Sequence, residues 1–111
     1  MLNFKTYQER ARSTAVYPGM GEGNWIYPTL GLAGETGEIC EKIKKAIRDD
    51  GGKIKPERLA NIEKELGDVL WYIAALSSEL GLDMETIAER NLAKLAARKE
   101  SGKIHGDGDH R

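Results

Sequence analysis

The chain has 111 residues, of which 40% are hydrophobic and 32% charged, and its formal net charge is −1. A chain of this length forms one domain and buries only about two-thirds of the surface that its unfolded state exposes, so self-association would enlarge a modest core. The near-neutral charge argues against binding nucleic acid through bulk electrostatics. No apolar run approaches the roughly 20 residues that cross a bilayer. With one cysteine, Cys40, which we expect in the core, a disulfide framework is excluded and a cytoplasmic protein is expected.

The composition is that of a helical protein. Ala, Leu, Glu, Lys and Arg make up close to half of the chain, whereas valine occurs only twice. Glycine and proline divide the sequence into four segments with helical periodicity. Asn3 and Asp83 are suitable N-caps for the first and the fourth, and Pro56 suits the first turn of the third. The predicted helices span residues 4–16, 29–48, 56–80 and 84–99.

The predicted fold is all-α, a four-helix bundle that forms an oligomer. Residues 1–101 make up one helical domain, and residues 102–111 form a polar, glycine-rich tail. Both histidines, His105 and His110, lie in that tail, which argues against zinc or histidine chemistry in the helical body. The apolar stripes predicted to face inward are Leu32, Thr36, Ile39, Ile43 and Ile47, then Leu59, Ile62, Leu66, Val69, Ile73, Leu76 and Leu80, then Ala88, Leu92, Leu95 and Ala96.

Two pairs of carboxylates carry the strongest functional signal. Glu35 and Glu38 are three residues apart on the second predicted helix, and Glu65 and Asp68 are three apart on the third. This spacing places both members of a pair on one helical face. Two such pairs on neighbouring helices would gather four acidic groups in one cleft, a ligand set suited to Mg²⁺ or Mn²⁺.

Each pair has an alternative interpretation. Glu38 could pair with Lys42, and Glu41 with Lys45, on an ordinary solvated face. The second pair begins an apolar run that we expect to be buried, where a carboxylate without a partner costs several kcal/mol. A metal ion, or a lysine or arginine from another helix, would satisfy it. Because neither pair contains histidine, a di-iron centre is not expected.

Further candidates could bind a nucleotide. Asn91, Lys94 and Arg98 share one face of the fourth helix, where they could hold phosphates or simply be solvated. Tyr72 lies one turn after Asp68, on the acidic side of its helix. Trp25, in a glycine-flanked loop, could stack on a base or cover the core.

The acidic motifs resemble those of the MazG-type all-α NTP pyrophosphohydrolases. Residues 31–38 read Gly-Leu-Ala-Gly-Glu-Thr-Gly-Glu, and residues 65–72 read Glu-Leu-Gly-Asp-Val-Leu-Trp-Tyr. The signature of this family is an ExxE motif followed at some distance by ExxD, and here 26 residues separate the two motifs. The resemblance extends over about residues 25–100.

The resemblance implies a dimeric or tetrameric protein that binds Mg²⁺ through Glu35, Glu38, Glu65 and Asp68. It implies cleavage of an NTP or dNTP to the monophosphate and pyrophosphate, in a role that sanitises the nucleotide pool. Glu38 would position or deprotonate the attacking water. Tyr72, Asn91, Lys94 and Arg98 match substrate-contact positions of relatives, although Lys99 stands where many relatives have an aromatic residue. The alternatives are a phosphoribosyl-ATP pyrophosphohydrolase and a non-enzymatic helical interaction module.

Overall fold

The computed structural model describes residues 1–102. Of the predicted tail only Gly102 is included, and both of its histidines lie outside the described residues. The described part of the chain contains four helices and no strand, which confirms the all-α class. None of its helices is long and apolar enough to cross a bilayer. The helices are α1 (Phe4–Arg12), α2 (Ile26–Asp49), α3 (Pro56–Glu79) and α4 (Met84–Ser101).

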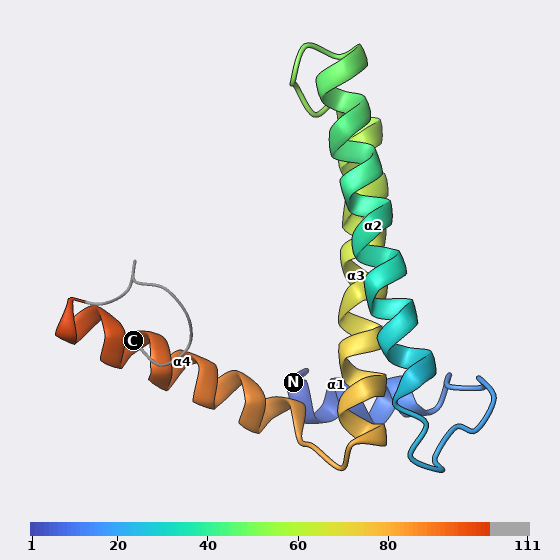
Figure 1. Cartoon of the computed structure of the whole chain (residues 1–111), viewed down its shortest axis with the longest axis vertical. Coiled ribbons are helices and arrows are strands. Elements are labelled where there is room, and N and C mark those ends of the chain that lie inside the picture. Colours follow the sequence, from blue (N-terminus) through green and yellow to red (C-terminus); the bar gives the residue numbers. More distant parts are fainter. Residues whose placement is uncertain (103–111) are drawn as a thin grey trace.

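The centre of the fold is an antiparallel hairpin of α2 and α3 (Figure 1). The chain reverses at Gly51 and Gly52, whose φ angles of 63° and 80° lie in the left-handed region that glycine adopts without strain. Pro56 then occupies the first turn of α3, where its missing N–H is not needed. This hairpin places the two acidic motifs on adjacent helices.

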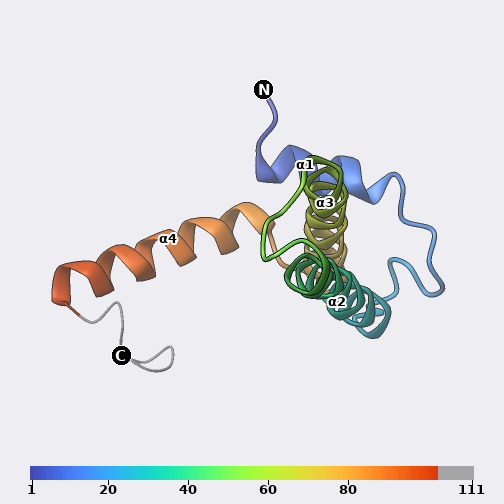
Figure 2. The same cartoon turned by 90° about the horizontal axis from the view of Figure 1, so that it is seen from above.

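At the open end of the hairpin, α1 packs across α3, and α4 begins beside it. Met84, which is only 4% exposed, packs with Ala11 of α1 and Ala74 of α3. Gln8 fixes this junction, because its side chain accepts a 2.8 Å hydrogen bond from the Met84 N–H and donates a 2.9 Å bond to the Leu82 carbonyl. From there α4 runs away from the hairpin (Figure 2).

The predicted four-helix bundle is therefore not closed within one chain. In the described residues, α4 contacts α1 and α3 near its start but makes no contact with α2. Several positions predicted to face inward are exposed as a result, among them Ile47 (66%), Leu66 (55%) and Leu92 (68%). Cys40 and Asp68, both expected to be buried, are also exposed. Among the described helices, α2 packs only against α3, and α3 is covered by α2 and by α1, so other apolar sides of the hairpin stay open.

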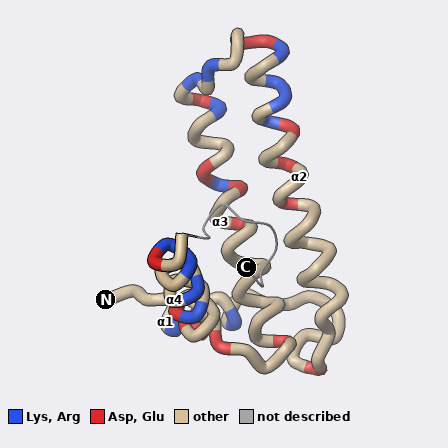
Figure 3. Tube along the Cα trace, turned by 60° about the vertical axis from the view of Figure 1, so that its left-hand side comes forward, with Lys and Arg blue, Asp and Glu red and all other residues tan. Residues whose placement is uncertain are grey.

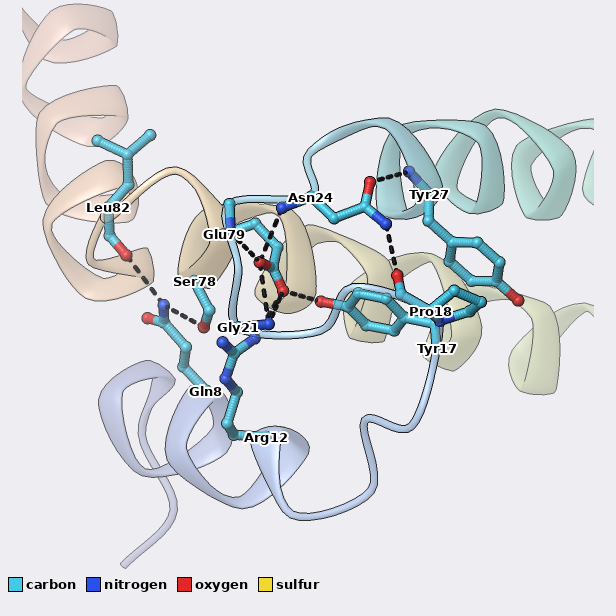
Figure 4. A network of polar contacts seen from close by, with 11 residues as sticks. Gln8, Arg12, Tyr17, Pro18, Gly21, Asn24, Tyr27, Ser78, Glu79 and Leu82 are labelled. Atoms are coloured by element: carbon cyan, nitrogen blue, oxygen red, sulfur yellow. Dashed lines mark hydrogen bonds and ion pairs between the residues drawn. The ribbon is translucent and has the colours of Figure 1, made fainter.

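The loop before α2 is fixed by Glu79, near the end of α3. This carboxylate accepts hydrogen bonds from the backbone N–H groups of Gly21, Gly23 and Asn24, at 3.0–3.2 Å (Figure 4). The positive φ angles of the two glycines let the N–H groups converge on one side chain. Because the chain enters this loop, α1 ends at Arg12, four residues before the predicted end.

Two side chains complete the Glu79 network. The hydroxyl of Tyr17 donates to Glu79 Oε2, and the Arg12 guanidinium lies 3.1 Å from the same oxygen. Burial by itself would raise the pKa of Glu79, but the N–H group of Gly21 and the contacts with Tyr17 and Arg12 outweigh it and lower the pKa to about 2. The ionised carboxylate is thus part of the folded state.

We expect Glu79→Gln to lower the free energy of unfolding by about 3–5 kcal/mol. The amide NH₂ group would face the hydrogen-bond donors that now surround a carboxylate oxygen, and Arg12 would lose its ion pair. Denaturant titration measures the loss, with Glu63→Gln, an exposed change on the same helix, as control. The folded pKa lies below the unfolded value of 4.5, so this contribution is present above pH 4.5 and is lost as the pH falls toward 2. Equal acid sensitivity of the wild type and Glu79→Gln would contradict this account.

Candidate metal centre

Three of the predicted acidic ligands meet between α2 and α3. Glu35 of α2 and Glu65 and Asp68 of α3 each offer one oxygen, and these oxygens all lie within 4.8 Å of one another. Glu35 and Glu65 are partly buried, whereas Asp68 is exposed. The three-residue spacing of the α3 pair turns both of its carboxylates toward α2. We call these three residues the acidic cluster.

Glu38, the fourth predicted ligand, lies beside the acidic cluster rather than in it. Its side chain is 59% exposed, and its Oε2 is 3.9 Å from Nζ of Lys42. Lys42 also approaches the acidic cluster, since its Nζ is 3.3 Å from Oε1 of Glu65. A lysine from the neighbouring helix, one of the alternatives left open by the sequence, is therefore present.

Lys42 does not balance the acidic cluster. One ammonium group faces three carboxylates, and Oε2 of Glu65 is buried without a hydrogen-bond partner in the described residues. An unsatisfied buried carboxylate oxygen is costly, so a native protein retains one where something else binds it. A hard divalent cation fits this oxygen-only set of donors.

The pKa values of the acidic cluster also favour a bound cation. The pKa of Glu35 is raised to about 7, first by the proton that it can share with Glu65, then by burial and by the charges of Glu65, Asp68 and Glu38. The same shared proton, helped by Lys42 and opposed by burial, lowers the pKa of Glu65. Below about pH 7 Glu35 is mostly protonated, and a cation that binds the acidic cluster would displace this proton.

Aromatic side chains line a cavity of about 280 Å³, and one of them, Tyr72, lies one helical turn after Asp68 of the acidic cluster. Burial, followed by the charges of Tyr27, Glu35 and Asp68, raises the pKa of the Tyr72 hydroxyl. Its ring lies so close to Gly31 that a Cβ there would be 2.2 Å from Cε1, so only glycine fits. Tyr17 and Tyr27 stack with ring centroids 5.1 Å apart across the same cavity. The lining residues are Thr14, Val16, Tyr17, Pro18, Tyr27, Trp71 and Tyr72.

Sequence reasoning missed Tyr17 and Tyr27 as members of this cavity. Their only signal is that one precedes and the other follows the glycine-rich loop. Trp25, the predicted base-stacking residue, lies at the start of α2 and is 54% exposed, and it is not among the residues that line this cavity.

The predicted phosphate-binding residues are not brought to the acidic cluster. Asn91, Lys94 and Arg98 lie on α4, which makes no contact with α2 in the described part of the chain. Asn91 is exposed, and Arg98 is buried. Within a single chain, the acidic and the basic parts of the predicted site therefore remain apart.

Comparison with known proteins places this arrangement in a family. Residues 28–102 match the model of the MazG nucleotide pyrophosphohydrolase domain, a span that contains both acidic motifs and α4. The chain is also similar to the Gene 37 protein of Mycobacterium phage L5, with 47% identity over 99% of this chain and 100% of the phage protein. No solved structure gives a significant match. The chain therefore belongs to the MazG nucleotide pyrophosphohydrolase family.

Proposed function

We propose that the protein is a Mg²⁺-dependent nucleoside triphosphate pyrophosphohydrolase that converts an NTP or dNTP to the monophosphate and pyrophosphate, in a role that sanitises the nucleotide pool. One observation carries the proposal: the acidic cluster, with its unsatisfied Glu65 oxygen, lies between the two motif helices of a MazG domain. Mn²⁺ would suit the same oxygen ligands.

The acidic cluster and Glu38 would hold the metal. A bound divalent cation would neutralise phosphate oxygens and lower the pKa of a water molecule. The chain itself would position the substrate and the water, since phosphoryl transfer asks little covalent chemistry of a protein. Glu38, which is exposed beside the acidic cluster, would orient or deprotonate the attacking water. Tyr72 and Trp25 would contact the nucleoside, as predicted.

We further propose that the protein works as a homo-oligomer, a dimer or a tetramer. Large apolar side chains on α2, α3 and α4 stay exposed in one chain, among them Ile47, Leu66 and Leu92. Burial of such surface is the main driving force of association, so a second subunit would cover these side chains. In such an assembly, α4 of one subunit would bring Asn91, Lys94 and Arg98 to the acidic cluster of another.

The test is pyrophosphate release from a panel of standard and modified NTPs and dNTPs, with Mg²⁺, Mn²⁺ or EDTA. We expect equal amounts of pyrophosphate and nucleoside monophosphate with either metal, and none in EDTA. Cleavage of phosphoribosyl-ATP alone would replace the proposed substrate class with that alternative. No release from any substrate by the folded oligomer would contradict an enzymatic role and favour an interaction module.

A further inference from the structure

A second cavity lies at the closed end of the hairpin. It has a volume of about 450 Å³ and is formed by the end of α2, the turn and the start of α3. At this end of the molecule, lysine and arginine segments lie on both helices, with aspartate and glutamate segments between them (Figure 3). The cavity is lined by four cationic side chains, Lys42, Lys45, Lys55 and Arg58, and by only two carboxylates, Asp50 and Glu57. We call it the basic cavity.

Asp50 holds two of these cations at the wall of the basic cavity. Its carboxylate, 10% exposed, is 3.3 Å from Nζ of Lys55 and 3.3 Å from the guanidinium of Arg58. Lys45 differs from them, because it forms no ion pair within 4 Å among the described residues. The basic cavity thus keeps positive charge that its own carboxylates do not neutralise.

The basic cavity adjoins the acidic cluster at Lys42. This side chain lines the basic cavity, and its Nζ is 3.3 Å from Glu65. Lys45 follows three residues later on the same face of α2, about 10.5 Å along the helix axis from Glu38. The start of α3, which has no side-chain cap, adds the positive end of a helix dipole. A multiply charged, elongated anion that reaches the acidic cluster would have its next cationic contacts here.

We propose that the basic cavity is a polyphosphate site that binds the β- and γ-phosphates of the substrate and then the pyrophosphate product, with Lys45 as a substrate-binding residue. The identity of this ligand rests on the proposed function, whereas the binding of a polyphosphate anion does not. The arrangement also orients the nucleotide. The triphosphate extends along α2 toward the turn, and the nucleoside lies on the opposite side of the acidic cluster, toward Tyr72.

Inorganic pyrophosphate tests this site directly. We would measure its dissociation constant by calorimetry, in EDTA and in Mg²⁺, for the wild type, Lys45→Gln, Lys45→Arg and the control Lys44→Gln. Lys44 is adjacent in sequence, 63% exposed and paired with Glu41, and it does not line the basic cavity. Loss of a charge-assisted contact predicts about tenfold weaker binding for Lys45→Gln in both buffers. Lys44→Gln should stay within about twofold of the wild type, and Lys45→Arg should retain the affinity.

A nucleoside monophosphate serves as the second ligand, because it lacks the phosphates that the basic cavity would hold. Its affinity should be the same in all four proteins. The proposal would be overturned if Lys45→Gln, shown by circular dichroism to be folded, bound pyrophosphate as tightly as the wild type does. It would also be overturned if Lys45→Gln bound pyrophosphate and the nucleoside monophosphate more weakly by the same factor. Since calorimetry in EDTA needs no turnover, pyrophosphate binding that depends on Lys45 could stand even if no triphosphate is hydrolysed. Conversely, if the protein hydrolyses triphosphates and Lys45→Gln changes neither turnover nor pyrophosphate binding, the polyphosphate site is contradicted and the proposed function is not.

Discussion

Asp68→Asn and Glu65→Gln should each lower Mg²⁺-dependent pyrophosphate release by about 10³-fold or more, because each removes a ligand from a metal that supplies several kcal/mol of transition-state stabilisation. Both substitutions keep the size and shape of the side chain and delete one negative charge. The measurement is kcat at saturating nucleotide over a series of Mg²⁺ concentrations, so that weakened metal binding and lost turnover are separated.

The matched control is Glu63→Gln, which deletes a charge at an exposed position of the same helix. It should change kcat less than twofold, since exposed charges contribute little. The thermal midpoint gives a second readout. In EDTA, Glu35→Gln should be at least as stable as the wild type, because burial and the charges of Glu65 and Asp68 disfavour the ionised form of Glu35 in the folded protein. Mg²⁺ should raise the midpoint of the wild type but not that of Glu65→Gln.

The alternatives give different results in the same experiment. If the acidic pairs only solvate a surface, both variants keep the Mg²⁺ response and any activity of the wild type. If Lys42 alone satisfies Glu65, then Lys42→Met by itself should be less stable than the wild type. The double variant Lys42→Met with Glu65→Gln should then be as stable as the wild type. Unchanged turnover in folded Asp68→Asn would contradict the proposed metal centre.

The placement of Glu35, Glu65 and Asp68 could be predicted from the sequence because it depends on local rules. A three-residue spacing fixes a shared helical face, and glycine and proline fix where α2 ends and α3 begins. Two helices joined by a short turn pack side by side, so their acidic motifs meet. For the same reason, the predicted ends of α3 differ from the observed ends by at most one residue.

The Glu79 network could not be predicted, because its donors carry no side-chain signature. Most are backbone N–H groups of a glycine-rich loop nearly 60 residues away in sequence. A carboxylate near the end of an apolar helix indicates only that some partner exists. Similarly, helical periodicity predicts an apolar stripe on α4 that includes Leu92, but it does not say whether the same chain or another covers that stripe.

Whether α4 contributes to its own site or to that of another subunit can be tested by complementation. If α4 of one subunit completes the site of another, then two inactive variants should complement each other in a mixed oligomer. We expect Asp68→Asn to be inactive through the acidic cluster, and Lys94→Gln combined with Arg98→Gln to lose about 100-fold through the phosphate contacts. In a symmetric dimer assembled from equal amounts of the two, about a quarter of wild-type activity should return, because half of the dimers carry one intact site of two.

The control for this complementation is a mixture of Asp68→Asn with Glu65→Gln. Both changes lie on α3 within one acidic cluster, so no arrangement of subunits restores an intact site and the mixture should stay inactive. Co-expression with two affinity tags isolates the mixed oligomers and verifies their composition, and isolated mixed dimers should have about half of the wild-type activity. Mixed oligomers of Asp68→Asn with the α4 variant that remain inactive would show that each site is built within one chain. In that case α4 would have to pack against α2 of its own chain. The apolar stripe of α4 would then be covered by that chain and not by another subunit.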